Sequence, residues 1–384
     1  MKPLAVLLLS LSLTLAGCAA LPPMPPAADL FHDELFAAPS APIDPGSALA
    51  VSAEMRSYLA ARLANRSRPL DRRRQLVDAL YRGDLKLEYD AAMTRTAAQA
   101  FEARSGNCLA LVMMTAAFAK ELGLNVRYQA VIGEQEWNRA DNLYIAIGHV
   151  NLVLEERREP TGFFATTAGP MVIDFLPPRD AQLLVTKSID ERTVVAMYLN
   201  NRAVESLTQG RVDDGYWFAR EALRSDPELL GAYVTLGVIY RTRHHAELSE
   251  QVLQRVAVRE PDNIYAMSNR VLALRDLGRA AEADALVRRL AALDPNPPFS
   301  YFREGMAALH EGRVEAARRL FAKEVARAPY HHEFEYWLAV SYMELNDVER
   351  ATIHLARARD ISTTRKDHDL YAGKLDRLKA LRAQ

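Results

Sequence analysis

Cysteine is nearly absent from this chain, because its 384 residues include only Cys18 and Cys108. A framework of structural disulfides is therefore excluded, since such a framework needs several pairs. Net charge is nearly absent as well, because 48 Lys and Arg oppose 49 Asp and Glu. Without an excess of one sign, the chain has no overall field that attracts nucleic acid or an anionic membrane surface.

The N-terminus carries an apolar run of the kind that directs a chain to a membrane. One lysine precedes an uncharged stretch, residues 3–17, which ends in Leu-Ala-Gly directly before Cys18. A short apolar run of this kind is typical of an export signal, and it is too short for a clear membrane span. The ending resembles the lipobox of bacterial lipoproteins, which implies a signal peptide over 1–17 and a lipid on Cys18. An ordinary signal peptide that is cleaved nearby is the alternative.

The lipobox resemblance also implies a location. The mature chain would lie on the periplasmic side of the bacterial envelope, and Ala19 resembles the signal for sorting to the outer membrane. No other apolar run is long enough to span, so we expect membrane contact through the lipid anchor alone. Cys108 is then the one free thiol in a compartment that favours disulfides.

The segment that follows, residues 18–46, is rich in proline and predicts a semi-rigid tether. It contains His32, Asp33 and Glu34, which are residue types that bind metals. Consecutive side chains do not share a face, so we interpret the segment as a solvated linker and expect no metal or other cofactor.

The second half of the chain has a period of 34 residues, which separates the prolines at positions 227, 261, 295 and 329. Small residues recur where two helices would cross, and apolar residues recur between them; examples are Tyr233, Leu236, Gly237 and Tyr240, and Gly305, Gly312, Ala317 and Phe321. This pattern resembles the tetratricopeptide repeat. It predicts five repeats over 196–363, which form an all-α superhelix, and a capping helix over 364–384.

Stacked helical pairs of this kind curve, and their concave face commonly holds a peptide or a protein. We therefore expect a peptide or protein partner on that face. The alternative is a scaffold that only packs on the preceding domain. The histidine pairs at 244–245 and 331–332 are interpreted as surface residues, because adjacent side chains point apart and no Cys or carboxylate cluster joins them.

Between the tether and the repeats, residues 47–192 predict an α+β domain. Apolar residues at helical spacing indicate helices over 47–64 and 70–81, and the long apolar run 109–124 predicts a buried helix. The segments 125–133, 149–156 and 170–177 are short and rich in Val, Ile and Tyr, which favours strands. Helices followed by strands, without alternation, are typical of the α+β class.

Cys108 falls at the start of the buried helix, where free N–H groups and the helix dipole favour an anion such as a thiolate. A nucleophilic thiol needs a base and a residue that orients the base. His149 opens the second predicted strand and Asp174 lies in the third, where a carboxylate needs a hydrogen-bond partner. Each residue alone has a simpler explanation: a buried core thiol, an incidental histidine or a strand-end cap.

Several segments resemble the transglutaminase-like superfamily. They are Thr96-Ala97-Ala98, Arg104-Ser105-Gly106-Asn107-Cys108, Leu122-Gly123-Leu124, Tyr128-Gln129-Ala130-Val131, Gly148-His149-Val150-Asn151-Leu152 and Val172-Ile173-Asp174. The resemblance implies a papain-like fold with Cys108 as nucleophile, His149 as base and Asp174 as its orienting partner. It also places Trp137 near a substrate channel. The expected oxyanion donor is the backbone N–H of Cys108, and Asn107 and Gln99 are further candidates.

Such a triad carries out acyl transfer through a thioester. We therefore expect an envelope-anchored thiol hydrolase, a peptidase or amidase, whose repeats bind a peptide or protein. The alternatives are a transglutaminase with an amine acceptor, and a non-catalytic adaptor of envelope proteins. Since the triad precedes the repeats, we expect it to survive removal of residues 196–384; the competing view is that the repeats form one wall of the site.

Overall fold

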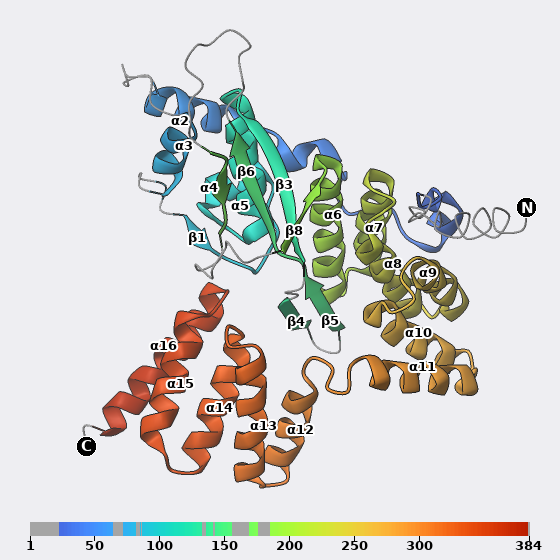
Figure 1. Cartoon of the computed structure of the whole chain (residues 1–384), viewed down its shortest axis with the longest axis vertical. Coiled ribbons are helices and arrows are strands. Elements are labelled where there is room, and N and C mark those ends of the chain that lie inside the picture. The colour runs from blue at the N-terminus through green and yellow to red at the C-terminus, as the bar shows by residue number, and fades with distance from the viewer. Residues whose placement is uncertain are drawn as a thin grey trace, which may run out of the picture.

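A computed structural model describes residues 23–63, 72–81, 85, 87–132, 136–140, 143–155, 169–175 and 185–382, the side chains of 136–147 excepted. The described chain is mostly helical, with a small sheet region in the first half of the sequence (Figure 1). Cys18 and the expected signal peptide lie outside these residues. Among the described helices, none combines the length and the apolar character that a membrane crossing requires.

We call residues 53–189 the sheet domain. Its helices and short strands before the main sheet are α2 (Ala53–Leu63), α3 (Arg72–Tyr81), β1 (Glu88–Tyr89), α4 (Ala97–Ala103), β2 (Ser105–Gly106) and α5 (Cys108–Glu121). The helix expected over 47–64 begins later, because the Ser52 hydroxyl accepts from the N–H of Met55 at 3.2 Å and so caps α2. A separate turn of 3-10 helix, η3 (Pro45–Leu49), precedes it.

The main sheet has four strands in the order β7-β6-β3-β8, and its neighbours are antiparallel. The strands are β3 (Asn125–Ile132), β6 (Val150–Glu155), β7 (Met171–Ile173) and β8 (Val185–Ile189). The first three correspond to the strands expected from the sequence. The structure adds β8 and a separate hairpin of β4 (Glu136–Ala140) and β5 (Leu143–Ile147), which were not expected.

The buried helix was predicted correctly. Every residue of α5 from Cys108 to Ala119 is buried, and the helix packs on the sheet (Figure 1). It ends where Gly123 adopts a positive φ of 71°, a conformation that glycine reaches without steric cost. The N–H of Leu124 then donates to the carbonyl of Ala119 at 2.9 Å, which closes the helix end.

The repeats follow as pairs of antiparallel helices. They are α6 (Glu191–Thr208) and α7 (Val212–Ser225), α8 (Leu230–Thr242) and α9 (Ala246–Arg259), α10 (Ile264–Asp276) and α11 (Ala280–Leu293), α12 (Ser300–His310) and α13 (Val314–Arg327), and α14 (His332–Glu344) and α15 (Val348–Asp360). The capping helix is α16 (Arg365–Arg382). Each of α7, α9, α11 and α13 ends two residues before its periodic proline, because the residue before a proline is forced out of the helical region. The 34-residue period is confirmed.

A second feature repeats with the same period. The turn inside each helix pair has one residue with positive φ, at Gly210, His244, Gly278, Gly312 and Asn346. Two repeats therefore have a side chain at a position that favours glycine. His244 is thus a turn residue. The adjacent His245 gave no indication of this role.

The expected solvated tether is wrong for its described part. From Pro23 onward the segment lies along α7, α8 and α9, where Leu30 and Phe36 are buried. The Phe36 ring stacks on Tyr216 with centroids 3.9 Å apart, and the Tyr240 hydroxyl donates to the carbonyl of Leu30 at 2.6 Å. The segment forms only short 3-10 helices here, η1 (Ala27–Leu30) and η2 (Asp33–Leu35), but the apolar side chains between the prolines still gain from burial.

The sheet domain and the first repeats share one hydrophobic core. A single cluster of buried side chains runs from Ala27 through α5 and α6 to Ala266. We call the described residues from Pro23 to Arg259 the joined unit. The expected boundary at residue 192 is therefore a boundary of sequence pattern, and it does not separate two cores.

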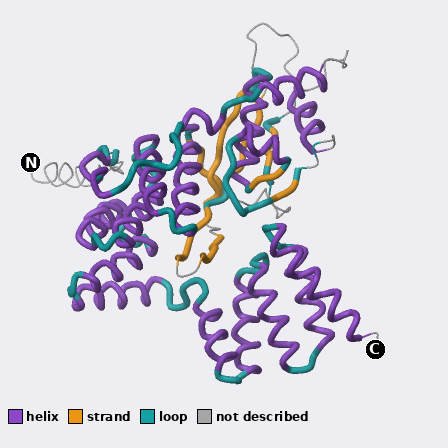
Figure 2. The backbone as a smooth tube through the Cα atoms, turned by 180° about the vertical axis from the view of Figure 1, so that it is seen from behind, coloured by secondary structure: helices purple, strands orange, loops and turns teal. Residues whose placement is uncertain are grey.

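The last repeats are packed separately. Buried side chains of α12 to α16 form two clusters of their own, and repeat 3 has a small cluster around Val271, Leu274 and Ala283. We call Ser300–Arg382 the distal unit. Figure 2 shows the chain bending between α11 and α12 so that the last helices return toward the sheet domain. There the N–H of Ala91 donates to the carbonyl of Thr363 at 2.8 Å, and Arg365 pairs with Glu88 at 2.8 Å.

Candidate active site

The start of α5 is held by a short, close-packed turn. The Asn107 side chain caps the helix by accepting from the N–H of Ala110 at 2.9 Å. Gly106 is needed for space, because a Cβ there would lie 2.9 Å from the Cβ of Ala110. The φ of Gly106 is not positive, so the need for glycine here comes from this close contact. Cys108 follows, a free and buried cysteine with 5% exposure.

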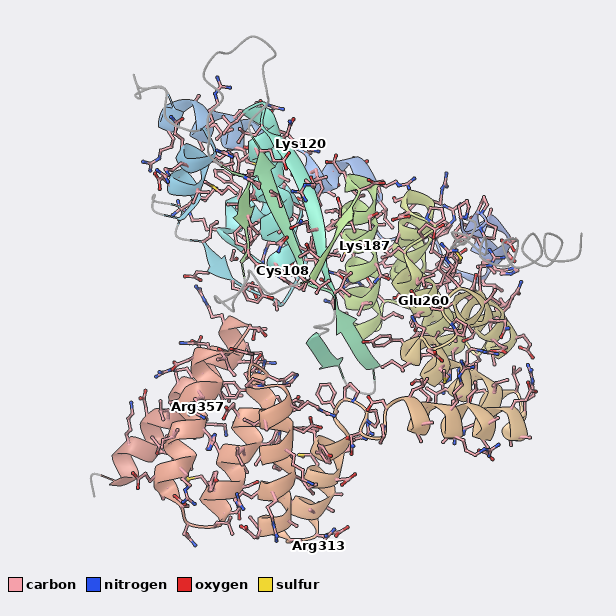
Figure 3. The ribbon with its side chains drawn as sticks, in the orientation of Figure 1. Cys108, Lys120, Lys187, Glu260, Arg313 and Arg357 are labelled. Atoms are coloured by element: carbon pink, nitrogen blue, oxygen red, sulfur yellow. The ribbon has the colours of Figure 1, made fainter. Side chains whose placement is uncertain are left out.

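Figure 3 labels Cys108 on the side of the sheet domain that is turned toward the distal unit. The N–H groups of Cys108 and Leu109 lie in the first turn of α5, where a helix offers no acceptor of its own. This end of the helix is therefore suited to stabilise negative charge, either on the thiolate or on an oxygen bound beside it.

His149 and Asp174 form a hydrogen-bonded pair beside the helix. His149 directly precedes β6, and its carbonyl accepts from the N–H of Val131 at 2.9 Å, which fixes the backbone. Its ring Nε2 lies 2.9 Å and 2.8 Å from the two carboxylate oxygens of Asp174, the residue after β7. Because β6 and β7 are paired neighbours, the sheet brings these two residues together.

Cys108 lies close to the ring of His149. The other ring nitrogen, Nδ1, is buried and makes no hydrogen bond, and the nearby thiol helps to raise the pKa of the ring. Burial alone would lower the pKa of His149, but the hydrogen bonds and charges of Asp174 and Cys108 outweigh it and raise the pKa to about 9. The arrangement therefore favours the imidazolium form of His149.

Asn151 is a further residue of the site, and it was not predicted from the sequence. The side-chain amide of Asn151 donates to the Asp174 carboxylate at 3.2 Å. Asn151 lies two residues after His149, so both are on the same side of the strand. The His-Val-Asn spacing was the available signal.

The remaining candidates have other contacts. Gln99 caps α4, since its side-chain oxygen accepts from the N–H of Thr96 at 3.0 Å. Asn107 uses its oxygen for the cap of α5 and donates its amide to Thr94 at 2.7 Å. Both side chains thus have structural roles at helix starts, and the backbone N–H of Cys108 is left as the better placed oxyanion donor. Trp137 lies in β4 opposite Ala146, and its side chain is outside the described residues.

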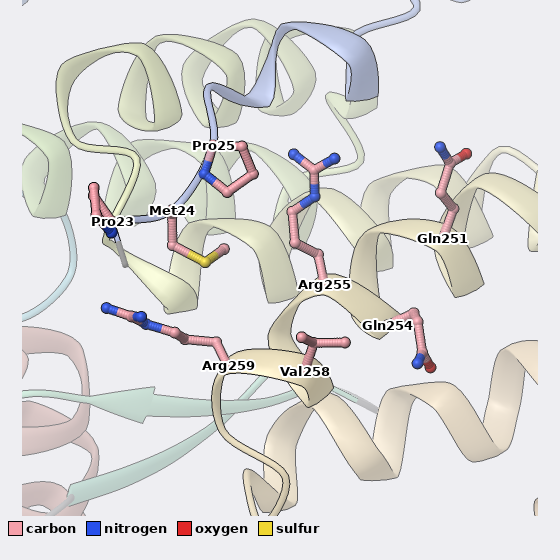
Figure 4. A pocket seen from close by; sticks show the side chains of 8 residues that line it. All are labelled: Pro23, Met24, Pro25, Gln251, Gln254, Arg255, Val258 and Arg259. Carbon is pink, nitrogen blue, oxygen red and sulfur yellow. The ribbon is translucent and has the colours of Figure 1, made fainter. Parts of the chain in front are cut away.

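A crevice of about 430 Å³ lies elsewhere, between the segment Pro23–Pro25 and helix α9 (Figure 4). Its lining includes Arg255, Val258 and Arg259 and none of Cys108, His149 and Asp174. Within the described part of the chain, no group of three His, Cys, Asp or Glu residues has the arrangement of a metal site.

Comparison with known proteins bears on the repeats. A family model of the tetratricopeptide repeat matches residues 302–365. The C-terminal half carries tetratricopeptide repeats. A TPR repeat-containing protein of Pseudomonas aeruginosa is 27% identical over 154 residues, which are 40% of this chain and 26% of that protein. The chain thus matches about a quarter of the length of this relative.

Solved TPR proteins are similar as well. One is YrrB, described as a TPR protein with an unusual peptide-binding site; it is 23% identical, with 47% of this chain and 92% of that chain covered and a TM-score of 0.25. Another is a thermophilic TPR protein of Thermus thermophilus, 16% identical, with 47% and 98% covered and a TM-score of 0.31. None of these comparisons supports the transglutaminase-like resemblance, which stays a proposal.

Proposed function

We propose that this protein binds a peptide or protein partner through its repeats and performs thiol-dependent acyl transfer in a transglutaminase-like, papain-like sheet domain. The observation that carries the chemical part is the position of His149, with Nε2 on the Asp174 carboxylate and the ring close to Cys108. The repeat family supports the partner-binding part, since stacked repeats of this kind commonly present a concave face to a peptide.

In the proposed reaction, the thiol proton of Cys108 resides on Nδ1 of His149, so the reacting pair is a thiolate and an imidazolium. The thiolate adds to an amide carbonyl carbon, and the oxygen takes the negative charge beside the N–H of Cys108. The imidazolium then gives its proton to the leaving amine, the C–N bond breaks, and a thioester remains on Cys108. Water adds next and releases a carboxylate and the free thiol. Asp174 keeps the proton on Nε2 and stabilises the imidazolium throughout.

Hydrolysis is the proposed outcome, so the protein is a peptidase or amidase; an amine in place of water would make it a transglutaminase. The acceptor is distinguished by incubating the protein with a glutamine peptide and a fluorescent amine. Hydrolysis gives a mass increase of about 1 Da on the peptide by exchange of –NH₂ for –OH. Transamidation gives a fluorescent peptide instead.

A non-catalytic adaptor is the second candidate, and two observations favour it: the matched family covers repeats only, and Cys108 is 5% exposed. The deciding experiment measures the rate at which iodoacetamide alkylates Cys108 at pH 7. An activated thiolate reacts about tenfold or more faster than the cysteine of the unfolded chain, and Asp174→Asn removes the advantage. A buried adaptor cysteine reacts more slowly than in the unfolded chain.

The chain offers a matched control for Asp174→Asn. In repeat 5, His354 pairs with the buried carboxylate of Glu335 at 2.6 Å, and no cysteine is present. Replacing His354 with Gln therefore disrupts a buried histidine–carboxylate pair outside the site. We expect this variant to keep the alkylation rate of the wild type. Equal loss in both variants would mean that the alkylation rate reports general damage.

The proposal includes an anchor at Cys18, which lies outside the described residues. Cys18 carries lipid, and the mature protein is held on the periplasmic side of the outer membrane. Cys18→Ser is then expected to appear in the soluble periplasmic fraction. To find the partner, Cys108→Ala is expressed in its native envelope, and co-purifying peptides are identified by mass spectrometry.

A further inference from the structure

Helix α6 of the first repeat contacts the turn that supports Cys108. The link is Thr94, a buried residue in the segment between β1 and α4. Its hydroxyl oxygen accepts from the side-chain amide of Asn107 at 2.7 Å, and Asn107 is the cap of the nucleophile helix. The same oxygen accepts from the side-chain amide of Asn201, in α6, at 3.3 Å.

Glu205 completes this network from the same helix. Its carboxylate accepts from the N–H of Thr94 at 2.6 Å. Arg202, one turn earlier on α6, pairs with the second oxygen at 2.8 Å. Asn201 and Glu205 are four residues apart, so both project from one face of α6 toward Thr94.

The network is satisfied and largely buried, which makes it stiff. Thr94 donates its N–H to Glu205 and accepts two side-chain amides on its hydroxyl oxygen, so its orientation is fixed from both sides. Asn107 in turn uses both ends of its amide, one on Thr94 and one on the N–H of Ala110. Burial raises the pKa of Glu205, while the bonds from Thr94 and Arg202 act in the opposite direction.

We propose that Glu205 and Asn201 of the first repeat are positioning residues for the nucleophile. Through Thr94 they hold Asn107, and Asn107 sets where the first turn of α5 presents Cys108 to His149. The repeat array is then part of the support of the site, although none of its residues in this network touches the thiol. This inference rests on the proposed function, because it assigns these residues to the reactivity of Cys108.

The test is the alkylation rate of Cys108 in the full chain at pH 7, well below the melting temperature. Thr94→Val keeps the shape of the side chain and removes the hydroxyl, and Thr94→Ser restores it. We expect Thr94→Val and Glu205→Ala to be about tenfold slower than the wild type, since small misplacements of reacting groups have large effects. Thr94→Ser and Glu205→Gln recover most of the rate.

Thr193→Val is the matched control, since Thr193 is also in α6 and donates to Asp226 at 2.6 Å, within the repeats. It is expected to stay within about twofold of the wild type. If Thr94→Val fails to fold, Asn201→Ala is measured in its place. It removes only the 3.3 Å hydrogen bond to Thr94, so we expect a smaller decrease in the alkylation rate.

The outcomes separate this inference from the proposed function. A wild-type thiol that is activated and sensitive to Asp174→Asn, but unchanged in folded Thr94→Val, overturns the positioning role alone. A wild-type thiol no faster than in the unfolded chain overturns both. Equal slowing in Thr94→Val and Thr193→Val also contradicts the inference, because it assigns the effect to general loosening of α6.

Discussion

Repeats 1 and 2 share one hydrophobic core with the sheet domain and the segment before it, whereas repeats 4 and 5 bury their side chains against each other and α16. The period of 34 residues is the same in both regions. The difference teaches that a shared repeat pattern does not imply a shared structural role. In this chain the first repeats complete the core that carries the candidate site, and the last repeats are attached through repeat 3 and a few contacts near Ala91.

The largest effect is expected from two truncations. Removal of residues 196–384 exposes the apolar face that α6 covers and deletes Leu199 and Ala203 from the core. Each buried side chain of the Leu class contributes about 1.5–3 kcal/mol, and total stability is about 5–15 kcal/mol. The truncated sheet domain should therefore lose cooperative unfolding and Cys108 reactivity. This replaces the expectation that the triad survives such a cut.

Removal of residues 298–384 is the matched comparison. It deletes the distal unit and leaves the shared core intact, so the thermal midpoint should shift by only a few degrees, as for a loss of about 1 kcal/mol. Cys108 alkylation should keep its rate. Circular dichroism melts and the alkylation rate check both truncations. Equal thermal midpoints and equal alkylation rates in the two truncated proteins would contradict the distinction between the joined unit and the distal unit.

The dependence of stability on pH should have opposite sign in the two units. The pKa of His149 is raised to about 9, so the folded joined unit holds a proton that the unfolded chain releases near 6.5. Its stabilisation is full below about pH 6.5 and is lost as pH rises through about 9, on the order of 2–3 kcal/mol. Denaturation at these two pH values checks this, and His149→Gln should flatten the difference.

In the distal unit, burial lowers the pKa of His332, although the charge of Asp367 acts against this. The folded state therefore binds its proton less tightly than the unfolded chain does. Stability of this unit should be full above about pH 6.5 and decrease below it. Hydrogen exchange of α14 at pH 5 and pH 7 measures the change, and faster opening at pH 7 would contradict the sign.

Two glycines allow one substitution to be compared in both units. A Cβ at Gly237 would lie 2.7 Å from Leu253, and a Cβ at Gly305 would lie 2.8 Å from Phe321. Overpacking costs about 1–3 kcal/mol, offset in part by about 1 kcal/mol of helix propensity. We expect Gly237→Ala to lower protection of α5 amides from exchange, and Gly305→Ala to lower protection in α12–α14 only.

The smallest effect concerns the turn residues with positive φ. His244 has a φ of 63°, where three other repeats have glycine, so His244→Gly should stabilise the protein by up to about 1 kcal/mol. Asn346 has a φ of 59°, but asparagine tolerates this conformation, so Asn346→Gly should change little. Chemical denaturation measures both. A loss of stability in His244→Gly would show that the imidazole has a role of its own.

Part of this structure could be predicted because it repeats or is strongly apolar. The helix pairs were predicted from the 34-residue period, and α5 was predicted from the apolar run that reaches Gly123. The pairing of His149 with Asp174 was accessible from the order of residues on neighbouring strands. β4, β5 and β8 were missed, because five-residue strands give little periodic signal, although the Asp141-Asn142 pair between β4 and β5 in the sequence is typical of a turn.

The packing between segments could not be predicted, for a physical reason. Proline-rich composition identifies residues that avoid helices, but it does not tell where Leu30 and Phe36 find an apolar surface. Likewise, the period identifies which side chains pack inside a repeat, and not which outer faces meet another domain. The link from Glu205 through Thr94 to Asn107 depends on that docking, so only the structure shows it.

Native-state hydrogen exchange tests the central comparison most directly, because it measures the opening free energy of each helix in the intact chain. The amides of α5, α6 and α8 should exchange through one common opening, and those of α12, α14 and α15 through another of lower free energy. The contrary result is exchange of α6 and α8 together with α12–α15, at a free energy distinct from that of α5. That result would make the repeats one array and leave the sheet domain, with Cys108, to fold on its own.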